Sequence, residues 1–506
     1  MTYNISRRGF IAASAAMAAS TALPRLAFGQ AAPMTLTAST RVLEIDGKAA
    51  TVYGLTNAAG KQGLILDPGQ QFRVDLTNSL DVETIIHWHG QLPPNVQDGV
   101  PNLPMPLLKV GEMRSFDYAP NPGTHWMHSH VPVQEMNLLA APLIVRNAED
   151  MAADRQEVVM FLHDFTFRPA DEVLAEITGG MSGHDMSAMG AEMVGTVTGA
   201  DTMAGMDHSG MDMSGGDMSG MDMSGMAMDG MAMEGMAMDL NDFNFDAYLA
   251  NDRTLADPEV IAVEKGGRVR LRIVNAASAT TFWIDTGVPA RLVAVDGHAI
   301  VPMPGTRFGM AMAQRLDIEI DLPGDGAFPV LALREGARER TGLILASTGA
   351  AVAKISGLSD VESAAFDIDM AQEMALQAAT PLTVRKADCA QMIMLGGSMQ
   401  PYLWTIDGQT WDTHTPITAV SGERVELMFH NMSMMGHPMH LHGHVFQVVN
   451  VKGRAINGAM RDTVYVPPMA RVTIALDAGE AARWMLHCHH MPHLSTGMMT
   501  EFAVSA

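Results

Sequence analysis

Residues 487–498 read His-Cys-His-His-Met-Pro-His-Leu-Ser-Thr-Gly-Met, and this stretch constrains the fold more than any other in the chain. Successive side chains of a strand point to opposite faces, so His487 and His489 point away from Cys488. One thiolate and two imidazoles with a weak axial methionine are the ligands of a blue-copper electron-transfer site. Cys488, His493 and Met498 supply three of these four ligands. The two flanking histidines must therefore face a second site, and Cys488 becomes a short covalent route between the two.

Three further segments carry closely spaced histidines, in two regions far apart in the chain. Residues two apart on a strand share a face, so a His-x-His pair can present two imidazoles to one metal cluster. A single pair is a weak signal, but four clusters in one chain indicate a shared metal centre. Imidazole binds copper, iron and zinc alike, and the thiolate selects copper. His437 is expected to complete the thiolate site, which leaves eight histidines for three more copper ions. The segments are His87-Trp88-His89, His128-Ser129-His130 and His437-Pro438-Met439-His440-Leu441-His442.

The rest of the sequence predicts an all-β protein. Short apolar or β-branched runs with period-two alternation are bounded by Gly, Pro, Asn and Asp, and long helical periodicity is scarce. Similar strands recur near residues 71–76, 268–274 and 423–429. A chain of 506 residues is also too long for a single core. We therefore expect three related β-sandwich domains, which we place at residues 33–147, 155–350 and 365–506.

Net charge, apolar run length and cysteine content each exclude one feature of the protein: a nucleic-acid partner, a membrane span and a disulfide. The formal net charge of -24 argues against nucleic acid, because phosphate binding needs a basic surface. The sequence has no apolar run of the roughly 18 residues that a membrane span needs. The chain contains two cysteines. Since Cys488 is assigned to copper, we expect Cys389 to be a buried apolar residue and the chain to contain no disulfide.

The first 31 residues have the pattern of an export signal. Ser6-Arg7-Arg8-Gly9-Phe10-Ile11 precedes an Ala-rich apolar stretch and the small-residue region Ala27-Phe28-Gly29-Gln30-Ala31. Paired arginines before a weakly hydrophobic segment resemble a twin-arginine signal, which exports folded proteins. The alternative is a disordered or amphipathic N-terminus with a chance Arg pair. Residues 1–31 therefore predict export to the bacterial periplasm.

The segment from Met181 to Met238 breaks the strand pattern. It holds 17 of the chain's 45 methionines among Gly, Ser, Ala and Asp, with a visible five-residue repeat such as Met221-Asp222-Met223-Ser224-Gly225. Such a segment cannot bury enough apolar surface to offset its ordering entropy, so we expect a flexible insertion in the second domain. One interpretation is a plain linker. Because thioethers are soft ligands that favour Cu(I), we favour a copper-collecting role.

Taken together, the four motifs resemble those of the multicopper oxidases over almost the whole chain beyond the export signal. The resemblance implies three Greek-key cupredoxin domains and four copper ions, with a trinuclear cluster between the first and third domains. For the mononuclear type 1 copper it implies the ligands His437, Cys488 and His493, with Met498 axial. For the trinuclear cluster it implies His87 and His440 on type 2 copper, with His89, His128 and His489 on one type 3 ion and His130, His442 and His487 on the other.

Within the family, the export signal and the insertion resemble bacterial copper-tolerance oxidases, of the copper-efflux oxidase type and the copper-resistance protein A type. The efflux oxidases carry their insertion in the third domain, and they place a methionine and a carboxylate before the first type 1 histidine. Met435 matches that methionine, as a candidate ligand of substrate Cu(I), but Ser433 stands at the carboxylate position. Asp98 matches an acid that delivers protons to oxygen, although it also suits a turn before glycine. Leu494 stands where the family has a second acid, so that proton route must differ.

The expected reaction is the four-electron reduction of O2 to water, with single electrons passing from type 1 copper through Cys488. The expected donors are Cu(I), in periplasmic copper tolerance, and small aromatic reductants such as phenols. We expect a monomer without a membrane span or nucleic-acid partner. A general laccase-type phenol oxidase and a copper-sequestering protein without significant turnover are the alternatives. A scaffold protein of this fold that has lost its copper and a copper nitrite reductase fit less well, because the full ligand set is present.

Overall fold

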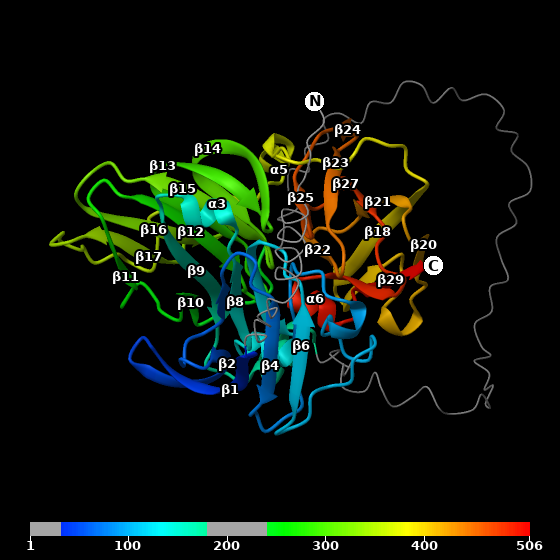
Figure 1. Cartoon of the computed structure of the whole chain (residues 1–506), viewed down its shortest axis with the longest axis horizontal. Helices are drawn as coiled ribbons and strands as arrows, with labels where there is room; N and C mark the ends of the chain where they lie inside the picture. Colours follow the sequence, from blue (N-terminus) through cyan, green and yellow to red (C-terminus); the bar gives the residue numbers. More distant parts are fainter. Residues whose placement is uncertain (1–31, 180–239) are drawn as a thin grey trace, which may run out of the picture.

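A computed structural model describes residues 32–179 and 240–506 of the chain. The predicted export signal at 1–31 and the predicted insertion at 181–238 lie outside these described residues. Figure 1 shows three groups of strands that follow one another along the chain, coloured blue to cyan, green, and orange to red. Contacts of β7 with β12 and β15, and of α2 with α6, join the first group to the second and to the third.

The first domain is a sandwich of two four-stranded sheets, with strand orders β2-β1-β4-β6 and β3-β8-β7-β5. In β4, Phe72, Val74 and Leu76 are buried while the residues between them are partly exposed, which is the period-two pattern of a strand with one face on a core. The core between the sheets includes Trp88, which stands between the first two histidines of the metal motifs. The strands are β1 (Met34–Ile45), β2 (Lys48–Asn57), β3 (Leu64–Leu66), β4 (Phe72–Asn78), β5 (Ile86–His87), β6 (Met113–Tyr118), β7 (Gly123–Ser129) and β8 (Ala140–Val145).

In the second domain the strands form one continuous nine-stranded hydrogen-bonded sheet around an apolar core. The long strand β13 explains the continuity, because its first half pairs with β16 and its second half pairs with β15. The register shifts between Asp285 and Ala290, around Gly287, whose φ of 66° favours glycine. The strands are β9 (Gln156–Phe165), β10 (Ala247–Ala250), β11 (Val260–Val263), β12 (Arg268–Asn275), β13 (Phe282–Val295), β14 (His298–Met310), β15 (Arg315–Asp321), β16 (Ala327–Arg334) and β17 (Arg340–Ser347).

The third domain contains a seven-stranded sheet and a five-stranded sheet around the largest apolar core. Cys488 and Met498 belong to this core. In the five-stranded sheet β22 lies between β26 and β28, so the last two histidine motifs are on neighbouring strands. The strands are β18 (Cys389–Met399), β19 (Tyr402–Ile406), β20 (Ile417–Val420), β21 (Arg424–Asn431), β22 (His437–Leu441), β23 (Phe446–Val451), β24 (Arg454–Ala455), β25 (Met460–Arg461), β26 (Thr463–Val466), β27 (Arg471–Asp477), β28 (Arg483–Cys488) and β29 (Met499–Ser505).

Short helices join the first and third domains beside the histidine motifs. The helix α2, which follows His130, contacts both α4 and α6. Met136, Val173 and Leu494, one from each of these helices, lie in a small apolar cluster. This cluster holds the two domains together next to the metal motifs. The helices are η1 (Asn95–Gln97), α2 (Pro132–Met136), α3 (Ala148–Ala152), α4 (Ala170–Ile177), α5 (Ala371–Ala375), η3 (Trp411–Thr413) and α6 (Met491–Ser495).

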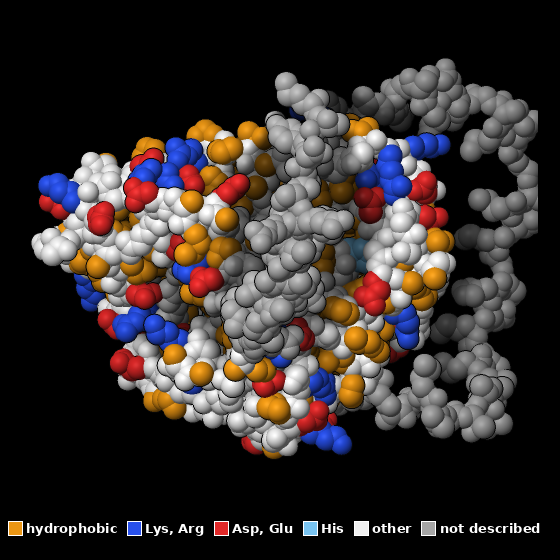
Figure 2. Space-filling model, in the orientation of Figure 1, with side chains coloured by type: hydrophobic (Ala, Val, Ile, Leu, Met, Phe, Trp, Pro, Cys, Tyr) orange, Lys and Arg blue, Asp and Glu red, His pale blue; other side chains and the backbone are white. Residues whose placement is uncertain are grey.

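Three expectations about the surface and the cysteines can be compared with the structure. Among the described residues, no helix has the length and apolar character to cross a bilayer. On the face shown in Figure 2, acidic and basic side chains are interspersed rather than gathered by sign. Both cysteines are free, but Cys389 is only partly buried, and the prediction of full burial was wrong. Cys389 is the first residue of β18 and packs at the rim of the core.

Candidate metal centre

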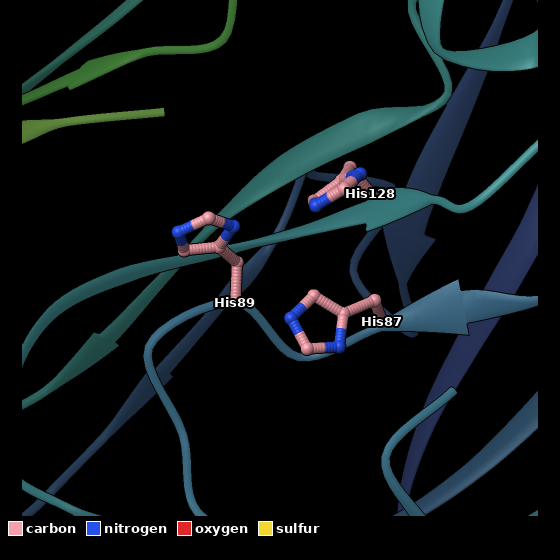
Figure 3. A group of neighbouring side chains, drawn as sticks. All are labelled: His87, His89 and His128. Atoms are coloured by element: carbon pink, nitrogen blue, oxygen red, sulfur yellow. The ribbon is translucent and has the colours of Figure 1, made fainter. Parts of the chain in front are cut away.

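The four histidine motifs meet between the first and third domains. The strands β5 and β7 end within the first two motifs, and the neighbouring strands β22 and β28 end within the others, so the last histidine of each motif lies one or two residues beyond the end of its strand. Figure 3 shows the rings of His87, His89 and His128 around a common space. All eight histidines assigned to the trinuclear cluster are at most 2% exposed. Strand pairing joins the two motifs within each domain, and the packing of the first domain against the third brings together imidazoles that lie several hundred residues apart in the sequence.

Distances between imidazole nitrogens show how closely the ligands approach one another, both between the two domains and within the third. The Nε2 atoms of His87 and His440 lie 3.4 Å apart, and those of His442 and His487 lie 3.1 Å apart. Several trios have donor atoms that all lie within 4.8 Å of one another. They include His87, His89 and His128; His87, His440 and His442; and His130, His442 and His487.

The unpartnered nitrogens of the cluster test whether these residues fit copper. In the part of the chain that the structure describes, both ring nitrogens of His130 and His489, the Nδ1 of His89 and the Nε2 of His128 have no hydrogen-bond partner. A buried polar atom without a partner is costly, and a metal ion is one of the few explanations. Burial also lowers the pKa of these four imidazoles well below the ordinary value. They are therefore neutral at pH 7, as a metal ligand must be. The residues fit the copper ions that the motifs imply.

Two aspartates stand behind the imidazoles and fix which nitrogen faces the cluster. An Oδ of Asp98 lies 2.8 Å from the Nδ1 of His442, and the carbonyl of Asp98 lies 2.8 Å from the Nδ1 of His87. An Oδ of Asp462 lies 3.1 Å from the Nε2 of His89. Ligand histidines commonly donate their second N–H to such a carboxylate or carbonyl, which orients the ring. The structure thus places Asp98 against two predicted ligands.

Asp462 belongs to a chain of buried charges that reaches the second domain. Its carboxylate pairs with both Nη atoms of Arg315, and Arg315 also contacts Asp296. Asp296 in turn pairs with Arg461 at 3.0 Å, and Arg461 pairs with Glu373 at 2.8 Å. All five side chains are at most 6% exposed. The orientation of His89 is therefore tied to contacts across the second and third domains.

The predicted type 1 ligands form a second site inside the third domain. The Nδ1 atoms of His437 and His493 lie 3.2 Å apart, and they lie 3.7 and 3.5 Å from the Sγ of Cys488. Ligands about 2 Å from one ion in a trigonal arrangement are separated by roughly these distances. The backbone of Met498 hydrogen-bonds to Cys488 and to His493, which holds this residue beside the trio. A thiolate and two imidazoles thus converge as a blue-copper site requires.

Cys488 connects the two sites through its own backbone. In β28 its neighbour His487 faces the histidine cluster, at 3.1 Å from His442, while its Sγ faces His493. The register pairs His440 with His487 and Met439 with Cys488, so the strand alternation is continuous across β22 and β28. The sequence of these residues therefore builds two metal sites on opposite faces of one strand.

Other residues named from the sequence have varied surroundings. Met435 is buried in the core of the third domain. Ser433 donates or accepts a hydrogen bond of 2.8 Å with the Nε2 of His437. Leu494 is buried in the apolar cluster of α2, α4 and α6. His444, two residues beyond the third motif, hydrogen-bonds with the His442 carbonyl and the Gly479 amide through its two ring nitrogens, which indicates a structural role.

Sequence reasoning missed three acidic residues near the two sites. Asp462 contacts His89, and Glu135 lies 2.8 Å from the Nδ1 of His128. Asp242 lies 3.9 Å from the Nε2 of His493 and also hydrogen-bonds to Tyr402. Each acid comes from a segment whose local sequence carries no metal-binding pattern. Only the tertiary structure brings these carboxylates to the histidines.

Comparisons with known proteins agree with this geometry. Three family models described as multicopper oxidase match residues 37–150, 217–353 and 385–506. The chain belongs to the multicopper oxidase family. It is an oxidoreductase whose cofactor is copper, and it uses O2 and a reducing substrate.

Individual relatives are distant but cover nearly the whole chain. The multicopper oxidase MmcO of Mycobacterium tuberculosis is 28% identical, over 94% of this chain and 87% of that protein. Copper resistance protein A of Escherichia coli is 23% identical, over 96% of this chain and 94% of that protein. The crystal structure of a multi-copper oxidase from Pseudomonas thermotolerans superposes with a TM-score of 0.66 at 22% identity, and covers 94% of this chain and 99% of that one. The fold is therefore that of the multicopper oxidases, with cupredoxin-like domains.

Proposed function

We propose that the protein oxidises Cu(I) and couples this oxidation to the reduction of O2 to water. The observation that carries the proposal is a group of exposed methionines on segments that are joined by backbone hydrogen bonds next to the type 1 ligand His437. Met394, Met432 and Met469 are 43%, 50% and 54% exposed. Soft thioether sulfur atoms favour Cu(I) over harder cations. We call these three residues the methionine patch.

Backbone contacts connect the methionine patch to a type 1 ligand. The amide of Met432 donates to the carbonyl of Leu395, next to Met394, and the amide of Met469 donates to the carbonyl of Ser433. The hydroxyl of Ser433 hydrogen-bonds with the Nε2 of His437. A Cu(I) ion held by the patch therefore lies near the imidazole edge through which an electron enters the site.

A carboxylate at the other imidazole supports the same substrate. Asp242 is buried and lies 3.9 Å from the Nε2 of His493 and 3.6 Å from the Nε2 of His490. The family's efflux oxidases are expected to place such a carboxylate at the position of Ser433, where this chain has none. Asp242 supplies a negative charge beside a type 1 ligand from a different segment. A cationic donor is attracted by that charge, whereas a neutral phenol is not.

The chain's own residues determine how the two sites work together. When bound, copper supplies one-electron chemistry at the thiolate site and the multi-electron reduction of O2 at the histidine cluster. Cys488 and His487 provide a covalent path between the sites, because they are neighbours on β28 and face opposite sides. The apolar core around Cys488 excludes water from the thiolate. We propose that Asp98 holds His87 and His442 in the orientation that the cluster needs and lies on the route by which protons reach it.

The proposal also covers the cellular location of the protein and the role of the methionine-rich insertion. We infer that residues 1–31 direct the chain to the periplasm by the twin-arginine route, and that residues 181–238 collect Cu(I) for the methionine patch. The proposal is supported by the similarity to copper resistance protein A and by the 17 methionines of residues 181–238. In this role the enzyme protects the periplasm against Cu(I).

The decisive experiment compares Cu(I) and a phenol as donors in variants that lose only sulfur. Replacing Met394, Met432 and Met469 together by Leu keeps size and apolarity. We expect the KM for Cu(I) to rise about tenfold or more while kcat/KM for the phenol is unchanged. The matched control replaces the equally exposed Met113 of β6 and Met151 of α3 by Leu, and it should behave as wild type.

Three outcomes decide the proposal. Unchanged Cu(I) kinetics in the triple variant would contradict a role of the patch. An equal loss with both donors would indicate a general laccase-type oxidase instead. Absence of O2 uptake with either donor in the wild-type protein would indicate a copper-sequestering protein. Deletion of residues 181–238 should lower Cu(I) oxidation and spare the phenol, and equal effects on both donors would remove the insertion from the proposal.

A further inference from the structure

Glu135 is a buried carboxylate that faces two predicted copper ligands at once. It lies in α2 and is 1% exposed. Its Oε2 is 2.8 Å from the Nδ1 of His128, and its Oε1 is 3.8 Å from the Nδ1 of His489. Among the described residues, neither oxygen has a hydrogen-bond partner, and the two imidazoles are the groups that face them. Each carboxylate oxygen therefore faces one imidazole ring.

The surroundings of Glu135 fix it in this position. The side chain of the preceding Gln134 accepts hydrogen bonds from Thr84 and Ser129 and donates one to the carbonyl of Glu83. The following residue, Met136, packs in the apolar cluster with α4 and α6. Polar contacts thus hold one side of α2 and apolar contacts hold the other. These contacts fix the orientation of α2 and with it the position of the Glu135 carboxylate.

A purely structural role gives a poor account of this carboxylate. A charged carboxylate at this place needs compensation, and no Lys or Arg contacts it among the described residues. The side-chain nitrogens that face it are the Nδ1 atoms of the two imidazoles, at 2.8 and 3.8 Å. The Nδ1 of His128 is shared with the carbonyl of Ser129, at 3.0 Å.

Other buried carboxylates also lie behind predicted copper ligands, and Glu135 completes the set for one type 3 ion. Asp462 contacts His89, and Asp98 contacts His442. The sequence assigns His89, His128 and His489 to the same type 3 copper. With Glu135 behind the last two, all three ligands of that ion have a carboxylate on the nitrogen that faces away from it.

We propose that Glu135 is a positioning residue for one type 3 copper, because its carboxylate lies against the Nδ1 edges of both His128 and His489 and holds their Nε2 atoms toward the same ion. The proposal rests on the proposed ligand assignment. Glu135 acts through two imidazoles and does not touch copper itself. Its place on α2, across the apolar cluster from Leu494, gives this chain an acid beside the trinuclear site although α6 has none.

The test measures copper binding rather than turnover. In Glu135→Gln the side chain keeps its size, but one oxygen becomes an amide that opposes an imidazole N–H. Loss of such an outer partner typically lowers metal affinity by about 10–100-fold. We therefore expect the affinity for one copper ion per chain to fall by this factor. The remaining type 3 ion then loses its magnetic coupling, so copper detected by electron paramagnetic resonance should increase, while the blue type 1 absorption is unchanged.

Two further variants separate positioning from general damage. Glu135→Asp keeps the charge but is too short to reach both rings, so its loss of affinity should be intermediate. The matched control is Glu172→Gln, on the exposed side of α4, which should bind copper as wild type does. The type 1 absorption reports in every variant whether the third domain is folded.

Specific outcomes contradict the proposal. Glu135→Gln with wild-type copper content and an unchanged resonance spectrum would overturn it. Parallel loss of type 1 and type 3 copper would also overturn it, because that result indicates a structural role. The readouts do not depend on the donor, so failure of the Cu(I) proposal leaves this test intact. A wild-type protein with only one bound copper would refute the ligand assignment itself.

Discussion

Replacing Arg461 by Met should strongly destabilise the protein, because it breaks the buried charge chain between the second and third domains. The guanidinium of Arg461 donates to Glu373 through Nε at 3.2 Å and Nη2 at 2.8 Å, and to Asp296 through Nη1 at 3.0 Å. The side chain is 2% exposed, and those of Glu373 and Asp296 are 6% and 0% exposed. Met fills most of the same volume without the charge.

The magnitude follows from what is left behind. Asp296 keeps the backbone amide of Arg315 at 3.0 Å and its guanidinium at 3.7 Å, so part of its charge stays compensated. Glu373 loses its only side-chain ion pair among the described residues. Breaking a buried pair by removing one partner costs about 3–5 kcal/mol. The exposed pair of Arg307 and Asp285 should be worth about 0–1 kcal/mol.

The assay is urea unfolding of the copper-free proteins, followed by tryptophan fluorescence. Arg461→Met should lower the free energy of unfolding by about 3–5 kcal/mol, and the control Arg307→Met by at most about 1 kcal/mol. The double variant Arg461→Met with Glu373→Gln should regain roughly half of the loss, because the stranded charge is removed. If Arg461→Met and Arg307→Met unfold at the same urea concentration, the reasoning about this buried chain is refuted.

Three more substitutions test other parts of the structure by the same unfolding assay. Burial raises the pKa of Glu335 from 4.5 to about 7, so the folded state favours its protonated form. The stabilisation from this protonated form is complete below pH 4.5 and is lost as the pH rises to about 7, a loss of roughly 3 kcal/mol. Glu335→Gln should abolish this dependence on pH. An identical pH profile in both proteins would contradict this. Asp164 accepts four hydrogen bonds of 2.9 Å from Ser278, Ala279 and Thr280. Asp164→Ala should lower the free energy of unfolding by about 3 kcal/mol or more. A loss below about 1 kcal/mol would show that other contacts hold this loop. Leu494→Glu places a carboxyl in the apolar cluster of α2, α4 and α6. It should lower the free energy of unfolding by at least about 2 kcal/mol at pH 7, and by less at pH 4, where the carboxyl is protonated. An unchanged free energy of unfolding would mean that the cluster admits water.

The sequence predicted the features that depend on local alternation. The all-β class and the approach of four histidine motifs follow from period-two patterns, and the structure shows both. Strand alternation also predicted that His487 and Cys488 face different sites, and the distances to His442 and His493 show this arrangement. The domain bounds, the export signal and the role of residues 181–238 stay predictions.

Features that depend on long-range packing were beyond the sequence. Nothing near Asp242 or Glu135 indicates that either carboxylate reaches a copper ligand, because helix packing and domain docking place them there. The continuous sheet of the second domain depends on a bulge within β13, which a general strand pattern does not reveal. The partial exposure of Cys389 depends on where β18 begins relative to the core. In each case the missing information is tertiary.

The most direct test of the central claim is the copper content and spectrum of the wild-type protein beside Cys488→Ser. Copper is counted per chain, and the blue absorption of the thiolate site is recorded from the same samples. We predict four copper ions and the blue absorption in the wild type, and three copper ions without the blue absorption in Cys488→Ser. A wild-type protein with a single copper ion, or a Cys488→Ser variant that remains blue, would contradict a mononuclear thiolate site joined to a trinuclear histidine cluster.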